Sequence, residues 1–500
     1  MKKKIFIFQQ REWHNRIGYF LAENFKKDGF ELGCLSFKKN VHKKIQENYE
    51  NLYEITINHD DIIENPLKYI PLNKRNLDVA EIIEDLEIEN MWQLTQSARH
   101  HSKSYKKKFY YSFEQNKTDD EIIIYFKALY YAAKKIYDEF KPDIILAPNF
   151  VSLPHAIFNL FYKKRNIMMI GTTDCKVAGK EIFTYDYLDR DSNFLRFLNE
   201  LNKKDKIEYD LRSVDEVISN SKDTNYRKIY FKMTKDYLYF PNIKKFLKRF
   251  LRDLYFSITK QRNNHIKGLG PTPDDRPFLI VVRDFVVFIK NMILEKGIQY
   301  HDLSEIKNFV YFPLQVQPES ATDLLSPLST NQIETARQIS MQLPPDFTLV
   351  VKDHPAMYGL RSYKYLRKIL KTPNIKLINF RHETTDVLKR SSLLITATGS
   401  TIFEAAVLKK PCLQLGELGT TLKLPNVIKR DTNLSLNKQI RDTLRLNISE
   451  NYEFFLRNFV FAGLKIGFDP YYRLIWEANK QGDLEKIYQI FFNEIKKLLA

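Results

Sequence analysis

The stretch "TATGSTIFEAAVLKKPCLQLGE" at residues 396–417 joins a short apolar strand to a helix and then to a second apolar strand. Gly399 permits a tight turn before the helix, and Ser400 and Thr401 stand at the first helical positions. Turns of this kind bind phosphates in open α/β sheets, because the N–H groups of a helix start point toward the ligand. They also serve as ordinary connections, so the rest of the chain must decide between the two.

The surrounding sequence repeats the alternation of strands and helices. In the second half, apolar runs predict strands at 308–315, 347–355, 375–380, 393–398 and 412–417, with helices at 329–343, 362–371 and 400–409 between them. In the first half, strands are predicted at 4–9 and 30–37 around a helix at 16–29, and 141–174 shows the same strand, helix, strand order. Continuous apolar strands are typical of parallel sheets covered on both faces, so the sequence predicts two α/β domains with doubly wound sheets.

The same patterns predict the domain limits. Residues 1–265 are expected to form an N-terminal α/β domain with helical insertions, 266–305 a linker rich in glycine and proline, 306–450 a C-terminal α/β domain, and 451–500 C-terminal helices that pack back toward the first domain.

The bulk composition is that of a soluble globular protein. Of 500 residues, 44% are apolar and 28% are charged, and the start of the chain lacks the apolar core of a secretory signal. The most apolar run, 278–294, is interrupted by Arg283, Asp284 and Lys290, which makes it a poor membrane span. The three cysteines are widely separated, which favours a cytoplasmic location over a disulfide framework.

The net charge of +18 indicates anionic partners or simply a lysine-rich genome. No nucleic-acid-binding motif accompanies the charge, so we do not expect a nucleic-acid partner. Residues 242–258 place apolar side chains on one helical stripe and basic ones on another. This pattern predicts either peripheral contact with an anionic inner membrane surface or a surface helix packed on its own domain.

Two motifs in the second half carry candidate nucleotide contacts. "VVKDHP" places Lys352, His354 and Pro355 at the carboxyl end of a strand, where open α/β sheets bind ligands. The alternative for His354 is a loop histidine bonded to its own backbone. In "ATGSTIFEAA", Ser400 and Thr401 can hold a phosphate next to Gly399.

Glu404 lies about one turn into the same helix, where a carboxylate can accept hydrogen bonds from two ribose hydroxyls. The alternative is a capping box in which Glu404 reaches back to Ser400 or Thr401, and both interpretations can hold together.

The candidates for general acid or base chemistry lie in three loops. Glu319 follows the strand at 308–315 in a polar loop predicted to face the space between the domains. In the first domain, Glu12 and His14 follow the first strand, and Asp174 ends a later one.

Several enzyme classes lack their signatures in this chain. GxxxxGK[ST], GxGxxG and GxSxG are absent, which argues against P-loop enzymes, common nicotinamide enzymes and α/β-hydrolases. His100 and His101 are adjacent and cannot share a helix face, so no metal site is predicted.

The second half resembles a known family. "FVYFPLQVQPES", "VVKDHP" and "ITATGSTIFEAAVLKKPCL", in this order and spacing, resemble bacterial capsule polysaccharide biosynthesis proteins, a group that includes the Kdo transferases. More loosely, the pattern is similar to the GT-B glycosyltransferase fold, in which two Rossmann-like domains face each other across a cleft. The resemblance is specific over about 305–420.

The resemblance implies a cytoplasmic glycosyltransferase that uses a CMP- or UDP-linked sugar and no tightly bound cofactor or metal. His354 and Pro355 would contact the nucleotide, Ser400 and Thr401 the donor phosphate, and Glu404 the ribose or base. The acceptor would be a capsule or surface polysaccharide, or its lipid-linked precursor, held by the first domain.

Two alternatives stay open. A nucleotide-sugar 2-epimerase shares the fold, but the familiar epimerases carry a second glycine and paired glutamates where this chain has "GSTIFEAA". A non-catalytic scaffold that binds glycan or nucleotide in a capsule assembly complex is the other.

Overall fold

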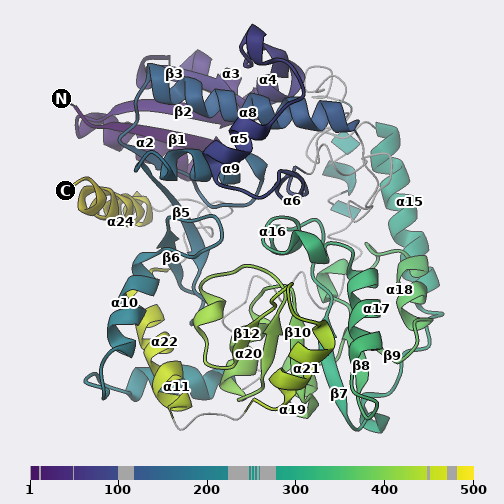
Figure 1. The fold of residues 1–500 in the computed structure, drawn as a ribbon. Coiled ribbons are helices and arrows are strands. Elements are labelled where there is room, and N and C mark those ends of the chain that lie inside the picture. The colour runs from purple at the N-terminus through teal and green to yellow at the C-terminus, as the bar shows by residue number, and fades with distance from the viewer. Residues whose placement is uncertain are drawn as a thin grey trace.

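The computed structural model describes residues 2–10, 13–48, 50–98, 117–222, 278–446, 451–469 and 481–500, together with helical residues between 247 and 258. Two lobes are visible, each built on one six-stranded sheet (Figure 1). We call them the first lobe, which contains β1–β6, and the second lobe, which contains β7–β12.

The first sheet has the order β3-β2-β1-β4-β5-β6, in which β6 alone runs antiparallel. Its strands are β1 (Lys4–Gln10), β2 (Glu31–Phe37), β3 (Ile55–Asn58), β4 (Ile144–Leu146), β5 (Met168–Asp174) and β6 (Glu181–Thr184). The helices that cover it are α2 (Tyr19–Lys27), α3 (Lys39–Asn48), α4 (His59–Glu64), α5 (Ala80–Leu86), α6 (Trp92–Thr95), α8 (Asp119–Glu139) and α9 (Leu153–Lys163).

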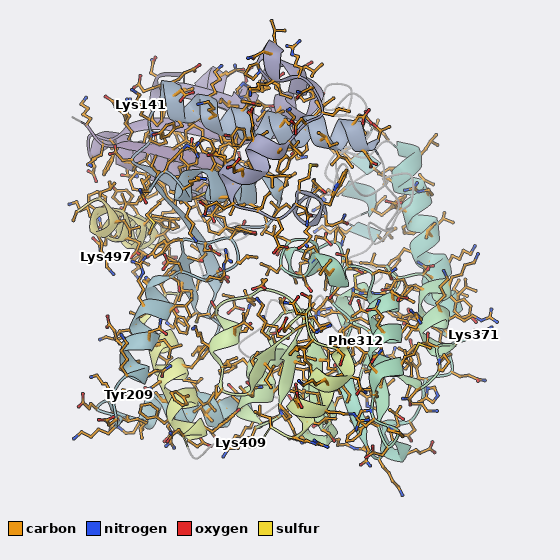
Figure 2. All side chains as sticks on the ribbon, viewed as in Figure 1. Lys141, Tyr209, Phe312, Lys371, Lys409 and Lys497 are labelled. Carbon is orange, nitrogen blue, oxygen red and sulfur yellow. The ribbon has the colours of Figure 1, made fainter. Side chains whose placement is uncertain are left out.

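The second sheet is entirely parallel, in the order β12-β11-β10-β7-β8-β9. Its strands are β7 (Phe309–Pro313), β8 (Thr348–Lys352), β9 (Ile375–Ile378), β10 (Leu393–Thr396), β11 (Cys412–Gln414) and β12 (Val427–Lys429). The helices are α16 (Ser320–Asp323), α17 (Gln332–Gln342), α18 (Tyr363–Leu370), α19 (Thr384–Arg390), α20 (Thr401–Val407) and α21 (Leu436–Leu444). Phe312 lies inside this lobe, whereas Lys371 and Lys409 point outward (Figure 2).

The predicted fold class is confirmed: both sheets are doubly wound, and helices follow at the C-terminal end of the chain. The strand order reverses between β1 and β4 in one sheet and between β7 and β10 in the other. Ligands of such sheets bind at the carboxyl ends of the strands on either side of the reversal. This rule places the candidate site of the second lobe at the ends of β7 and β10.

The chain crosses between the lobes, and it does so at places that differ from the predicted limits. Helices α10 (Asn193–Asn202) and α11 (Arg212–Ser221) share a buried cluster with α22 (Tyr452–Ile466) and α20 in the second lobe, although 1–265 was expected to form one domain. Apolar residues of α24 (Gln481–Leu499) pack with α2 and β1 of the first lobe. The predicted linker contains a long helix, α15 (Phe278–Glu295), because its apolar residues recur at helical spacing. The residues that marked it as a linker, Gly268, Gly270, Pro271 and Pro273, lie outside the described residues.

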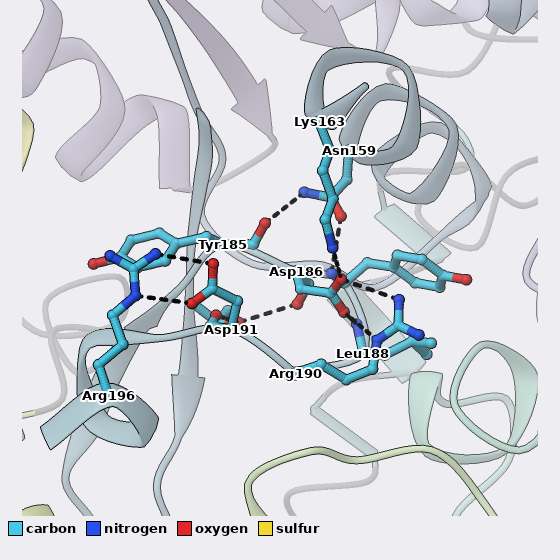
Figure 3. Close-up of polar contacts among 10 residues, drawn as sticks. Asn159, Lys163, Tyr185, Asp186, Leu188, Arg190, Asp191 and Arg196 are labelled. Atoms are coloured by element: carbon cyan, nitrogen blue, oxygen red, sulfur yellow. Dashed lines mark hydrogen bonds and ion pairs between the residues drawn. The ribbon is translucent and has the colours of Figure 1, made fainter. Parts of the chain in front are cut away.

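The junction near β6 is held by a buried carboxylate, Asp186, whose oxygens accept hydrogen bonds from Lys163, Arg190 and the Leu188 amide (Figure 3). Burial alone would raise the pKa of Asp186, but the bonds and charges of Arg190 and Lys163 lower it below its ordinary value. The Gly419 amide of the second lobe donates to Leu188 O at 2.8 Å. The two lobes therefore meet through backbone as well as side chains.

Within the described ranges, no helix is both long and apolar enough to cross a bilayer. Cys34, Cys175 and Cys412 are buried free thiols.

Candidate functional site

The ends of β7 and β10 meet through Gln315 and Thr396. Gln315 Nε2 donates to Thr396 Oγ1 at 3.0 Å. Gly399 lies beside this pair, because a side chain added to it would come 3.5 Å from Gln315 Oε1. The φ of Gly399 is 122°, a conformation that favours glycine. Gln315, Thr396 and Gly399 are thus adjacent at the topological switch point.

A buried ion pair fixes the loops on one side of this point. Arg361 Nε lies 2.9 Å from Asp353 Oδ1, and the two side chains are only 1% and 5% exposed. Arg361 Nη2 also donates to the backbone carbonyl of Gln315. The backbone N–H of Gln315 donates to Gln332 Oε1 at 2.6 Å. Arg361 therefore ties the end of β7 to the end of β8. The sequence offered no motif for this arginine, which lies eight residues beyond Asp353.

His354 is held as a neutral hydrogen-bond donor. Its Nδ1 accepts the Ala356 amide at 3.1 Å, so the neutral ring carries its proton on Nε2. Burial, together with the charges of Arg361 and Lys352, lowers the pKa of His354 to about 4. This backbone bond is the alternative raised from the sequence, and it leaves Nε2–H to face another group. Pro355 follows as the first residue of a 3₁₀ turn.

Lys352, the last residue of β8, and Glu404, in α20, are both only 4% exposed. The Lys352 ammonium donates to His382 O and Thr384 Oγ1, each at 2.8 Å, and so fastens the loop that follows β9. Burial, then the nearby Glu404 charge, raises the pKa of the β7 residue Tyr311 far above its ordinary value. Glu404, a residue of α20, is therefore close to Tyr311.

Ser400 and Thr401 stand at the start of α20, as predicted. Ser400 is exposed and its hydroxyl makes no capping hydrogen bond, so Ser400 is not the cap of a capping box. Ser400 directly follows Gly399, the residue that lies beside Gln315. Ser400 is the predicted residue whose position best suits contact with a ligand.

Glu319 is exposed and directly precedes α16. The hydroxyl of Thr398, which follows β10, donates to Ala321 O at 3.3 Å, so this short helix lies beside the switch point. Leu324, at its end, packs in the apolar cluster of the first lobe. The α16 segment therefore lies where the lobes meet.

The first-lobe candidates are not brought together in the same way. His14 is 1% exposed, and its Nδ1 lies 3.0 Å from Gln9 Oε1. Burial and the charge of Lys44 lower the pKa of His14 to about 4. Asp174, at the end of β5, accepts from the Lys176 backbone N–H and ammonium at 2.7 and 3.1 Å in the connection between β5 and β6. Glu12 lies outside the described residues.

Sequence reasoning missed a buried histidine at the switch point of the first lobe. His155, in the first turn of α9, contacts Gln10 at the end of β1 through Nε2 and Ser152 Oγ through Nδ1 at 2.8 Å. The Phe37 ring stacks on it with 5.5 Å between centroids. Burial, then the His59 charge, lowers the pKa of His155 to about 3. The Ser-Leu-Pro-His turn after a predicted strand was the signal that could have indicated it.

Elsewhere in the first lobe, a cavity of about 660 Å³ opens beside β3 and α3. It contains none of the predicted residues, and its lining lysines Lys39, Lys43, Lys68 and Lys135 each pair with a neighbouring carboxylate. Among the described residues, no three potential metal-binding side chains of the His, Cys, Asp or Glu types come together.

No protein-family model and no curated protein matches the chain. Solved structures similar to it include the β-Kdo 2,7 transferase KpsC of Thermosulfurimonas dismutans, at 11% identity and a TM-score of 0.31 over 65% of this chain and 78% of that one. UDP-GlcNAc 2-epimerase of Methanocaldococcus jannaschii matches at 11% identity and a TM-score of 0.23, over 98% of this chain and 99% of that one. The calicheamicin glycosyltransferase CalG4 matches at 11% identity and a TM-score of 0.26, covering 98% of each chain. Both transferases and epimerases are therefore among the matches.

Proposed function

We propose that this chain is a glycosyltransferase that moves a sugar from a CMP- or UDP-linked donor to a capsule or surface polysaccharide, or to its lipid-linked precursor, at the cytoplasmic face of the membrane. The observation that carries the proposal is the Gln315–Thr396 contact beside Gly399 at the switch point. It supports a ligand site because the exposed Ser400 hydroxyl and an open glycine turn stand at the carboxyl ends of two parallel strands.

In this proposal the donor phosphate lies at Gly399, Ser400 and Thr401. Hydrogen-bond donors there would neutralise the charge that develops on the departing nucleotide, which requires no metal. His354 would donate from Nε2 to the nucleotide beside Pro355, and Glu404 would accept from the ribose. Lys352 would act indirectly, since its ammonium holds the loop at Thr384.

The acceptor would bind on the first lobe, with Glu12, His14 or Asp174 as the base and Glu319 lining the space between the lobes. A base must be unprotonated at neutral pH. The lowered pKa of His14 meets that requirement, and its burial requires the acceptor hydroxyl to reach a shielded ring.

Thermal unfolding with CMP, UDP and their sugar conjugates tests the donor site. A ligand at 100 times its dissociation constant adds about 2.7 kcal/mol to the unfolding free energy. We expect one nucleotide series to raise the unfolding temperature, and Ser400→Ala and Gln315→Ala to reduce the increase. Thr432→Ala, at an exposed threonine of the same lobe, is the matched control.

The products then separate the alternatives. Release of nucleotide with sugar transfer to a glycan supports a transferase. Interconversion of the sugar without an acceptor would indicate an epimerase, and binding without turnover a scaffold. If no nucleotide changes the unfolding temperature, the donor site is refuted.

A further inference from the structure

Helix α15 buries polar side chains together with Val281 and Phe288, and it exposes other apolar side chains to the exterior. Asp284, Asn291 and Glu295 are only 6%, 5% and 6% exposed. Leu279 and Ile293 are 76% and 62% exposed, and Val286, midway between them, is 57% exposed. Residues two helical turns apart share a face, so these three form one outward apolar stripe. A surface helix usually turns polar side chains toward water, so an outward stripe of three apolar residues is unusual.

Specific contacts hold α15 in this orientation. Asn291 Nδ2 donates to Gly359 O at 3.1 Å, and the Tyr300 hydroxyl donates to Glu295 Oε1 at 3.0 Å. Gly359 leaves room for Phe288, which would lie 2.7 Å from a side chain added there. The inner face of α15 is thus fixed to the second lobe. Helix α15 lies at the rim of the molecule (Figure 1), and the exposure of Leu279, Val286 and Ile293 shows that the apolar stripe faces outward.

A second exposed apolar stripe lies on the neighbouring helical residues between 247 and 258. Leu247, Leu251 and Ile258 are 43%, 53% and 66% exposed, at spacings that place them on one helical face. The ring of Phe250 packs on Phe285 of α15, with 4.3 Å between the centroids. The two helical segments are therefore in contact, and both expose apolar side chains.

Among the described residues of these two segments, the exposed charged side chains are positive. Lys248 and Arg252 are exposed on one segment and Lys290 on α15. Both carboxylates of α15, Asp284 and Glu295, are buried on the opposite face. Basic side chains beside an apolar stripe complement anionic headgroups above an acyl layer.

We propose that the α15 surface, defined as Leu247, Leu251, Ile258, Leu279, Val286 and Ile293, binds the surface of a bilayer that contains anionic lipids. The apolar side chains enter the boundary between headgroups and acyl chains, and the lysines and arginines contact the phosphates. Such a contact was one of the two interpretations of the basic sequence at 242–258, and the structure adds the outward apolar stripe of α15. The inference is independent of the proposed sugar transfer.

Sedimentation of the full chain with vesicles tests this surface. One set contains only phosphatidylcholine, and the other also contains phosphatidylglycerol. We expect binding to the mixed vesicles only, with a decrease as salt is added, because salt screens the headgroup charges. The triple variant Leu279→Gln, Val286→Gln, Ile293→Gln should bind at least about tenfold more weakly, because three apolar side chains leave the membrane together.

The matched control is Leu72→Gln with Met341→Gln, two residues that are 79% and 62% exposed elsewhere on the molecule. This control should bind mixed vesicles like the unchanged chain. If the triple variant unfolds at a lower temperature, Lys290→Glu provides a test that keeps the apolar stripe intact and should weaken binding several-fold.

Three results would overturn the proposal: no binding to mixed vesicles, equal binding to both vesicle types, or retained binding by the triple variant. A chain that is dimeric in solution, becomes monomeric in the triple variant and ignores vesicles would show that the surface joins two copies instead.

Discussion

Arg361 and Asp353 form an ion pair at 2.9 Å with almost no access to water, and Arg361 also donates to the carbonyl of Gln315. The pair joins the ends of two adjacent strands directly behind the candidate donor site. Burial, opposed by Arg361, raises the pKa of Asp353. The carboxylate therefore depends on this arginine for its charged form.

Arg361→Met should lower the free energy of unfolding by about 3–5 kcal/mol, because it leaves a buried carboxylate without its partner. Denaturant titration measures this change. Adding Asp353→Asn should recover part of the loss. Arg337→Met, which breaks an exposed pair with Glu334, is the control and should change little. A similar effect of the two arginine variants would contradict the buried-pair interpretation.

Gly419→Ala should weaken the junction between the lobes. An added Cβ would clash with the backbone carbonyl of Asp189, which cannot move aside as a flexible side chain would. Overpacking of this kind costs about 1–3 kcal/mol. Gly482→Ala is the matched control, since nothing lies near its Cβ and alanine favours the α24 helix. Calorimetry should show a loss of stability for the first variant and none for the second.

The buried histidine His155 should make the protein less stable in acid. Its pKa is about 3 in the folded chain and near 6.5 when unfolded. Between these values only the unfolded state gains the proton, so stability falls as the pH falls, by about 1.4 kcal/mol per pH unit for one such group. His155→Gln should reduce that slope in unfolding measured from pH 7 to pH 4. An unchanged slope would show that the ring is protonated in the folded state.

Glu295 should have the opposite effect. Burial, then the charge of Asp353, raises the pKa of Glu295 to about 7, whereas the unfolded value is near 4.5. The folded state keeps its proton between these values, so stability falls as the pH rises from about 4.5 to 7. Glu295→Gln should therefore gain stability relative to the unchanged chain as the pH increases. A constant difference across this range would refute the assignment.

Thr396→Val should affect ligand binding more than folding. Valine keeps the shape of the side chain but removes the hydroxyl that accepts from Gln315. We expect a stability change of about 1 kcal/mol, the usual net value of one hydrogen bond. The temperature increase produced by a bound nucleotide should decrease more strongly, because Gln315 is then free to move beside Gly399. If the substitution reduced stability and the nucleotide-induced temperature increase equally, Gln315 would lie outside the ligand site.

Much of the fold follows from apolar periodicity. The predicted strands at 4–9, 308–315, 347–355 and 393–398 are confirmed by β1, β7, β8 and β10. Strands β3, β6 and β12 were not predicted, since each has only three or four residues and lies toward a sheet edge, where fewer apolar side chains are required.

Only those parts of the candidate site that lie within one short stretch of sequence could be predicted. The turn at 396–401 carries its own signal in Gly399 and the hydroxyls that follow. Contacts between distant residues, such as Gln315 with Thr396, leave no spacing to recognise. The packing of α10 and α11 against the second lobe was missed for the same reason. Their partner α22 comes about 250 residues later in the chain, as the hydrogen bond between Tyr209 and Asn458 illustrates.

The return of α24 to the first lobe determines when that lobe can be completed during synthesis. Phe491 and Ile495 belong to the same buried cluster as Ile5 and Phe25. Part of this cluster therefore stays uncovered until residues 481–499 leave the ribosome. Because lobes otherwise tend to fold as they emerge, the first lobe must wait, partly unfinished, while the second lobe is made.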